Sequence, residues 1–363
     1  MKKFPLSFLL LLVGATNSFG VILFDTGDPN VNTTAPGGTL ANSGWQYQGD
    51  WGGFLGTPIS PKFFITAGHF GQAGAALSYQ NVNYPVIGSF SLAGSDFVLW
   101  KIAGTFPSFA PLYTKRNEVG QHLIVFGRGT ERGTERYLDN TLRGWNWAAD
   151  STAGTRRWGE NDVSEIFPYQ GHDTLHATFD QHLLPNDHPN ECHLSNGDSG
   201  GAVFLKDGAV WKIAGINFLV DDLYTAPPNA TKFTAAIFDA RGYYTSDEKN
   251  PPTFTQISDP APVPTGFYAS RISSELAWIG SVIADPQIGY ESDQATLTYW
   301  RLTAPSTEIV YEIQQSTDLT AWTSAISQDE IVATAGELQQ VKAKVNPGGD
   351  RLFLRLRVTR PQG

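Results

Sequence analysis

The stretch that decides the fold of this chain covers residues 195–204 and reads Ser195-Asn-Gly-Asp-Ser-Gly-Gly-Ala-Val-Phe204. Glycines on both sides of Ser199 let the backbone turn tightly and keep its main-chain N–H groups uncovered. An apolar, strand-like run begins at Ala202, directly after the turn. A bare Gly-Ser-Gly would indicate only a hairpin, whereas a serine framed in this way is a candidate nucleophile.

A serine hydroxyl is a poor nucleophile at neutral pH, so the chain must supply three kinds of help. These are a base that takes the proton, a group that orients the base, and donors for the developing oxyanion. The main-chain N–H groups of Gly197 and Ser199 are the candidate oxyanion donors, because the glycines let them face the same point.

Two further segments supply the base and its orienting group. Residues 63–69 (FFITAGH) are an apolar strand that ends in small residues and then His69. Residues 94–102 (GSDFVLWKI) place Asp96 at the start of a second strand. Taken alone, His69 would be a structural or solvent-facing histidine and Asp96 a turn carboxylate. Together with the serine segment they predict His69 as general base and Asp96 as its orienting partner.

The three segments resemble the chymotrypsin-like (trypsin-like) serine protease family. Residues 197–201 match its serine motif without a change, residues 66–69 match its histidine motif with glycine in place of alanine, and residues 96–99 match its aspartate strand. The order His, Asp, Ser along the chain is also that of the family. The resemblance covers about residues 45–244. It implies a double β-barrel and an endopeptidase that forms an acyl-enzyme on Ser199, with no cofactor and no metal.

The same resemblance implies a primary substrate pocket. Its base aligns with His193, six residues before the nucleophile, and two wall positions align with Val220 and Thr231. The base carries no aspartate, which argues against Arg or Lys specificity. The walls carry larger residues than glycine, so we expect a narrow pocket that prefers small apolar side chains.

Three departures from the family pattern bear on the site. Cys192 is the single cysteine, so the usual disulfides are missing, and we interpret it as a buried structural residue. Phe218 stands where the family often has a serine that touches the triad aspartate, which leaves the support of Asp96 open. Val21 would become the N-terminus after export without the glycines of an activation sequence. We therefore expect no zymogen step and some other partner for Asp198.

The flanking sequence predicts four regions. Residues 1–20 combine Lys2 and Lys3 with a short apolar core, which indicates a signal peptide cleaved after Gly20. Residues 21–246 form the protease domain, and the proline-rich residues 247–266 are expected to be an extended linker. Residues 267–363 show strand-like runs and predict a small C-terminal β-sandwich-like domain of unknown role, which loosely resembles modules appended to exported bacterial proteins. We expect secretion, extracellular or periplasmic, from a bacterium.

The charge of the chain indicates which partners are unsuitable. The net charge is −10, and loss of Lys2 and Lys3 with the signal peptide takes it to −12. An acidic chain is poorly suited to nucleic acid or to an anionic membrane surface. No segment after the signal peptide is apolar enough to span a membrane. We therefore expect protein or peptide substrates.

Three other interpretations stay open. Histidines and acids crowd residues 172–193, and His172 and His176 have the spacing of a helical metal pair, although no glutamate sits at the usual base position. A catalytically silent pseudoprotease that acts as a binding or surface module is a second alternative. An adhesin or carbohydrate-binding protein is the third, and it rests on the C-terminal domain and on Trp145, Trp147 and Trp158.

Overall fold

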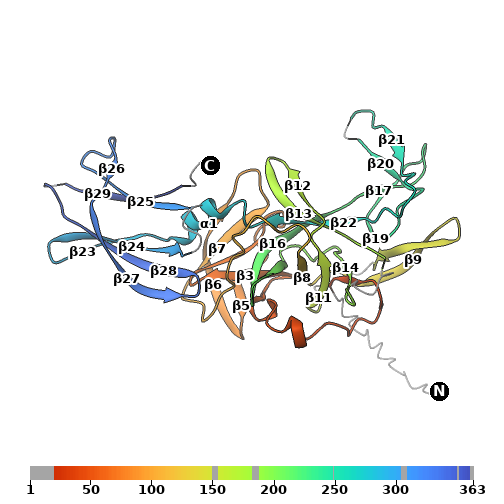
Figure 1. The fold of residues 1–363 in the computed structure, drawn as a ribbon, viewed down its shortest axis with the longest axis horizontal. Helices are drawn as coiled ribbons and strands as arrows, with labels where there is room; N and C mark the ends of the chain where they lie inside the picture. The colour runs from red at the N-terminus through yellow and green to blue at the C-terminus, as the bar shows by residue number, and fades with distance from the viewer. Residues whose placement is uncertain are drawn as a thin grey trace, which may run out of the picture.

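The computed structural model describes residues 20–148, 154–181, 188–247, 249–303, 309–349 and 351–359. Of the predicted signal peptide, only Gly20 falls within these ranges. The described chain is almost entirely β-structure, with one α-helix, α1 (Leu276–Ile283), and two short 3-10 helices, η1 (Gly38–Leu40) and η2 (Trp45–Tyr47) (Figure 1). The all-β prediction is therefore confirmed.

The first half of the chain forms a closed six-stranded barrel. Its strands, in order around the barrel, are β2 (Gly49–Trp51), β3 (Phe54–Ser60), β4 (Phe63–Ala67), β7 (Phe97–Ile102), β6 (Val82–Ser91) and β5 (Ala76–Tyr79). Strand β4 is buried on both faces. Phe64 packs with Trp51 and Trp100 in one cluster, whereas Phe63 and Ile65 pack with residues of the following sheet. Because side chains alternate along a strand, this one apolar run contributes side chains to the core of the first barrel and to the core shared with the following sheet.

The second half forms a seven-stranded antiparallel sheet. Its order is β11 (Arg157–Asp162), β8 (His122–Gly127), β15 (Ala202–Asp207), β16 (Val210–Val220), β22 (Gly266–Arg271), β13 (His172–Thr178) and β12 (Glu165–Tyr169). Asn161 Nδ2 on β11 donates to the carbonyl of Thr178 at 2.7 Å, and Ser164 N donates to the carbonyl of His176 at 2.8 Å. These bonds bring β11 back to β13, so the sheet curls into the predicted second barrel.

Smaller sheets surround this barrel. Strand β1 (Ile22–Leu23) pairs with β14 (Cys192–His193). A three-stranded sheet contains β19 (Ala235–Ile237), β10 (Thr141–Trp147) and β9 (Arg132–Leu138). A four-stranded sheet contains β18 (Lys232–Phe233), β17 (Leu223–Tyr224), β20 (Tyr244–Ser246) and β21 (Phe254–Gln256), and it projects at the right of Figure 1.

The structure differs from the predicted division at residues 247–266. Strand β21 lies within that range and pairs with β20, and β22, which starts at Gly266, pairs with β13 and β16 inside the second barrel. The barrel unit therefore extends through β22 and α1. The prolines lie in the connecting segment between β16 and β22. Proline is tolerated there because no neighbouring strand needs its main-chain N–H as a donor.

The C-terminal unit is a sandwich of two sheets, at the left of Figure 1. The sheets are β23 (Gln287–Glu291), β24 (Gln294–Leu302), β28 (Leu338–Val345) and β27 (Ser327–Ala335), and β26 (Thr323–Ser324), β25 (Val310–Ser316) and β29 (Phe353–Thr359). Leu297, Ile313 and Val341 share its core. Ile279 and Ile283 of α1 belong to the core cluster of the barrels. Helix α1 therefore joins the sandwich to the barrels.

Among the described residues, no helix has the length and apolar character needed to cross a bilayer.

Candidate active site

His69 and Asp96 meet because two neighbouring strands end at the same place. Strands β4 and β7 are antiparallel, and their register pairs Ala67 with Phe97. The residues just beyond this pair, Gly68 and Asp96, face each other, and Gly68 N donates to the carbonyl of Asp96 at 2.6 Å. His69 follows directly, so the sheet register alone brings imidazole and carboxylate together.

The Asp96 carboxylate is held by three donors. It accepts a hydrogen bond from His69 N at 2.7 Å, from Gly68 N at 3.2 Å and from His69 Nδ1 at 2.8 Å. A carboxylate accepts hydrogen bonds, so the proton of the imidazole is drawn to Nδ1. The lone pair then lies on Nε2, which is the atom that faces Ser199.

Ser199 lies on the loop between β14 and β15, and its Oγ is 2.9 Å from His69 Nε2. Gly200, with φ of +78°, lets this loop pass close to β4. A Cβ at that position would come within 2.3 Å of Thr66 Oγ1. A larger residue there would push the serine away from the histidine. Ser199, His69 and Asp96 thus form one continuous hydrogen-bonded chain.

The two predicted oxyanion donors, Gly197 N and Ser199 N, lie on this loop. Gly197 has φ of +95°, a conformation that favours glycine. Within the described part of the chain, neither Gly197 N nor Ser199 N makes a hydrogen bond. N–H groups of this kind, when they lack a partner and lie close to a hydroxyl, have the chemistry needed to stabilise an oxyanion.

Asn217, a residue that the sequence reasoning missed, clamps this loop. Its buried side chain donates to the carbonyl of Asp198 at 3.1 Å and to that of Phe126 at 2.8 Å. Its main chain accepts from Gly200 N at 3.1 Å and donates to the carbonyl of Gly201 at 2.9 Å. The only sequence signal is a polar residue that interrupts the apolar run of β16.

Asp198 is surrounded by donors from several segments, and the main-chain N–H of Val21, still in peptide linkage to Gly20, is one of them. The buried carboxylate accepts from Val21 N at 3.1 and 3.2 Å. It also accepts from Ser195 N and Gly129 N, each at 2.7 Å. Burial raises the pKa of Asp198 to about 6 against these hydrogen bonds. The pairing of Ile22 in β1 with His193 in β14 holds Val21 in place, and this contact does not depend on an activation sequence.

A cavity of about 160 Å³ opens beside Ser199. Val220, one of the predicted pocket residues, lines it together with Trp147 and Leu219. His193 is not part of its lining, because the side chain is fully buried and its Nδ1 lies 2.6 Å from the carbonyl of Leu194. Burial lowers the pKa of His193 to about 4, so this imidazole is neutral at pH 7.

Thr231 also lies outside this lining. It is exposed on the hairpin between β17 and β18, where its N–H donates to Thr225 Oγ1 at 3.0 Å. Phe218 lines the cavity, and its ring centroid is 6.5 Å from that of His69. The main-chain donors at Gly68 and His69 support Asp96 on the other side.

The residues on which the other interpretations depend do not come together in one site within the described part of the chain. His172 and His176 lie on strand β13, and they contact different acids, Glu275 at 3.0 Å and Glu165 at 3.2 Å. His182 and Asp187 lie outside the described residues. Cys192 is buried, and burial raises the pKa of its thiol. Trp145 and Trp158 are core residues, whereas Trp147 lines the cavity beside Ser199.

Comparison with known proteins gives similarity in structure alone. No family model and no curated protein sequence matches the chain. It is similar to the active form of the protease Rv3671c from M. tuberculosis, at 13% identity and a TM-score of 0.31 over 50% of this chain and 67% of that one. It is also similar to the secreted serine protease VesC from Vibrio cholerae, at 10% identity and 0.36 over 95% and 66%. These scores are low, so the geometry of the site must support any function.

Proposed function

We propose that this protein is a serine endopeptidase that cleaves peptide bonds through Ser199, His69 and Asp96. One observation carries the proposal. Ser199 Oγ is 2.9 Å from His69 Nε2, and His69 Nδ1 is 2.8 Å from the Asp96 carboxylate. A hydroxyl, a base and an orienting carboxylate in that order form the machinery of acyl transfer.

Ser199 Oγ attacks the carbonyl carbon of the substrate, and its proton passes to His69 Nε2. The carbonyl oxygen becomes an oxyanion, which accepts from Gly197 N and Ser199 N. His69 then returns the proton to the leaving amine as the C–N bond breaks, which leaves an acyl ester on Ser199. His69 then takes a proton from water, which attacks the ester carbonyl carbon. As the C–O bond to Ser199 breaks, His69 returns that proton to Ser199 Oγ and the acid leaves.

The cavity beside Ser199 supports a preference for small apolar residues before the cleaved bond. Its volume is about 160 Å³, and Trp147, Leu219 and Val220 give it an apolar wall. Among its lining residues the only charged side chain is Asp198, and the carboxylate of Asp198 is already engaged by four donor groups. A substrate lysine or arginine would therefore enter without a counter-charge.

We further propose that the protein is exported and that cleavage after Gly20 completes the site. Cleavage would convert the Val21 N–H that contacts Asp198 into an α-ammonium. A buried carboxylate gains more from an ammonium than from a peptide N–H, because the charges compensate each other. The Asp198 carboxylate lies directly before Ser199, so this pairing would stabilise the oxyanion loop.

Peptide-library digestion followed by mass spectrometry tests the proposed activity. The chain beginning at Val21 should cleave after Ala, Val or similar residues, and Ser199→Ala should abolish cleavage. Ser89→Ala, an exposed serine on β6, is the matched control and should retain full activity. A well-folded wild type without cleavage would favour the silent binding module, and cleavage mainly after Lys, Arg or large aromatic residues would contradict the narrow pocket.

A further inference from the structure

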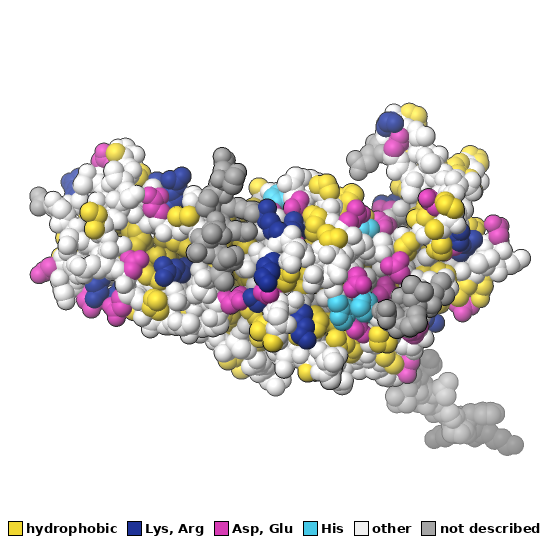
Figure 2. Space-filling view, viewed as in Figure 1, with side chains coloured by type: hydrophobic (Ala, Val, Ile, Leu, Met, Phe, Trp, Pro, Cys, Tyr) yellow, Lys and Arg dark blue, Asp and Glu magenta, His cyan; other side chains and the backbone are white. Residues whose placement is uncertain are grey.

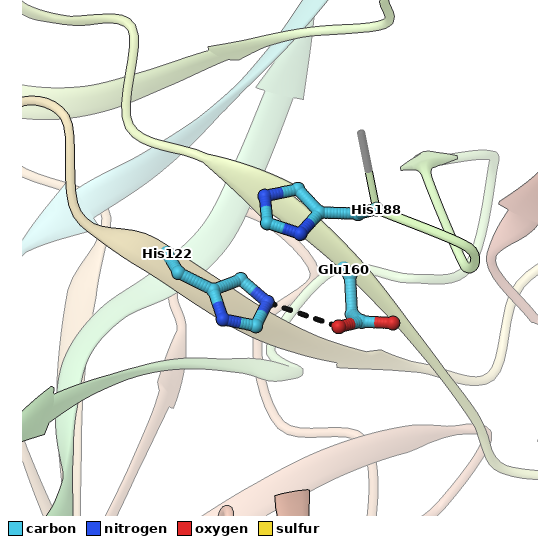
Figure 3. Close-up of side chains that lie close together, drawn as sticks. All are labelled: His122, Glu160 and His188. Carbon is cyan, nitrogen blue, oxygen red and sulfur yellow. Dashed lines mark ion pairs between the residues drawn. The ribbon is translucent and has the colours of Figure 1, made fainter. Parts of the chain in front are cut away.

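Outside the active site, two histidines and a glutamate meet at the edge of the second barrel. His122 begins β8, Glu160 lies on β11, and His188 lies on the turn before β14. One ligand atom from each residue lies within 4.8 Å of the other two. Figure 3 shows one ring nitrogen of each histidine facing the Glu160 carboxylate.

The backbone fixes this arrangement. His122 pairs directly with Asp162 across the β8–β11 ladder, so their side chains share one face of the sheet. Glu160 is two residues before Asp162 and therefore shares that face. Glu160 N donates to the carbonyl of Asn190 at 2.8 Å, and Glu191 N donates to that of His188 at 3.0 Å. Main-chain bonds thus hold the turn of His188 against β11.

His122 and Glu160 form an ion pair, which Figure 3 marks with a dashed line. His122 Nε2 lies 3.1 Å from Glu160 Oε1. However, Nε2 is buried and has no well-aligned hydrogen bond within the described part of the chain. An imidazole nitrogen directed at a carboxylate in this way leaves a polar contact that a shared cation would satisfy.

The other side of the cluster has supporting groups of the kind that orient metal ligands. His188 Nε2 lies 2.9 Å from Asp162 Oδ1, which leaves Nδ1 as the nitrogen that faces Glu160. Asn190 Nδ2 donates to Glu160 Oε2 at 2.5 Å and orients that carboxylate. Metal-binding histidines commonly bond a carboxylate through their second nitrogen. The rings of His122 and His188 stack at 4.2 Å, so two protonated rings would repel each other.

An ion can reach this cluster from solvent. A cavity of about 410 Å³ lies in front of it, lined by His122, Glu160, Asn190 and Trp211 among others. The side chains of His122 and His188 are 33% and 20% exposed, whereas that of Glu160 is 5% exposed. Figure 2 shows that some histidine side chains reach the surface beside acidic ones on the face drawn there.

We propose that His122 Nε2, His188 Nδ1 and a Glu160 oxygen bind a Zn²⁺ ion, with water as the fourth ligand. Two imidazoles and a carboxylate suit a transition-metal dication rather than Ca²⁺ or Mg²⁺, which prefer oxygen ligands. Ligand atoms around tetrahedral zinc lie roughly 3.3 Å apart, whereas those of the cluster lie within 4.8 Å of one another. The two rings stack at an interplanar angle of 10°, so one ring must also turn for both nitrogens to face a single ion. The ion would tie β8 and β11 to the turn that leads into β14 and the Ser199 loop.

Titration calorimetry with ZnCl₂ on the metal-stripped chain beginning at Val21 tests this site. A His69→Ala background prevents binding at the triad. We expect one Zn²⁺ per chain, a weak response to Ca²⁺, and a rise in Tm with Zn²⁺. His122→Ala and His188→Ala should each weaken binding about 100-fold or more. Asp162→Asn, which removes only the supporting carboxylate, should weaken it about 10- to 100-fold.

His172→Gln is the matched control, because this histidine also contacts a carboxylate, that of Glu275, but lies outside the cluster. It should bind Zn²⁺ as tightly as the parent chain. Co²⁺ bound to the parent chain should show the intense visible absorption of a four-coordinate site, and this readout needs no ligand variant to fold. Absence of 1:1 binding, or tight binding that survives both His122→Ala and His188→Ala, would overturn the proposal.

Discussion

Two aspartates lie close to Ser199 and His69, and the chain holds them in opposite ways. Asp96 lies at a strand end beside the half-exposed His69, and its donors come from residues 68 and 69. Asp198 is fully buried, and its donors come from segments far apart in the chain, including Val21, 177 residues away.

This difference indicates that Asp96 acts mainly on the chemistry of His69, whereas Asp198 acts mainly on how the segments around it pack. Asp96 acts on one imidazole, and its loss leaves few buried groups without partners. The carboxylate of Asp198 joins the N-terminal strand, the loop at Gly129 and the oxyanion loop. Its loss would orphan several buried N–H groups at once. We therefore expect substitutions at Asp96 to lower the rate of catalysis alone. Substitutions around Asp198 should lower both that rate and the free energy of unfolding.

Asp96→Asn should produce the largest effect on rate. An asparagine can present an N–H to His69 Nδ1, which would place the imidazole proton on Nε2 and remove the base from Ser199. We expect kcat to fall about 10⁴-fold at pH 7, with a free energy of unfolding within about 1 kcal/mol of the wild type. Steady-state kinetics and urea unfolding measure the two quantities. A large loss of stability would break the distinction between the two aspartates.

The pH dependence of stability should reveal the role of Val21. With Val21 in peptide linkage, the pKa of Asp198 is about 6, above its usual 3.8. The folded state then binds the proton more tightly than the unfolded state. The contribution of Asp198 to the free energy of unfolding is therefore fully present below about pH 4. It falls by roughly 3 kcal/mol as the pH rises through about 6. An α-ammonium on Val21 would lower that pKa and reduce the fall.

Urea unfolding from pH 4 to pH 7 checks this expectation. A chain that retains residues before Val21 is compared with one that begins at Val21, and Asp198→Asn in each form shows how much of the pH dependence belongs to this carboxylate. Identical pH dependence in the two wild-type forms would mean that the new N-terminus does not pair with Asp198.

Asn217→Ala should have the smallest effect of the three. It removes two buried donors, those to the carbonyls of Phe126 and Asp198. We expect a loss of about 1–3 kcal/mol in the free energy of unfolding and a lower kcat, because the oxyanion loop loosens. Asn83→Ala, an exposed asparagine on β6, should change neither by more than about 0.5 kcal/mol. Equal behaviour of the two variants would show that the clamp contributes nothing.

The sequence predicts the parts of this protein that depend on local pattern. Ser199 is predicted from the glycines around it, and His69 and Asp96 from short strand-end motifs that gain meaning only in combination with the serine segment. The all-β class follows from short alternating runs. Each motif is contained within a few residues, so it can be detected without knowing which strands pair, although the triad is predicted only from the three motifs together.

Features that depend on pairing between distant strands could not be predicted from the sequence. The contact of Val21 with Asp198 requires the pairing of β1 with β14. The placement of β22 in the second barrel requires its two partner strands, and no local signal distinguishes it from a strand of the following unit. The cluster of His122, Glu160 and His188 combines two strands and a turn, so its spacing matches no short motif.

Labelling with a fluorophosphonate, measured by intact mass and peptide mapping, tests the central claim most directly. An activated serine attacks phosphorus, whereas an ordinary serine does not. The folded chain beginning at Val21 should gain one adduct, mapped to Ser199. Ser199→Ala should gain none, and Asp96→Asn should label far more slowly. A folded wild-type chain that stays unlabelled, or that carries its adduct on another residue, would contradict the assignment of Ser199 as the nucleophile.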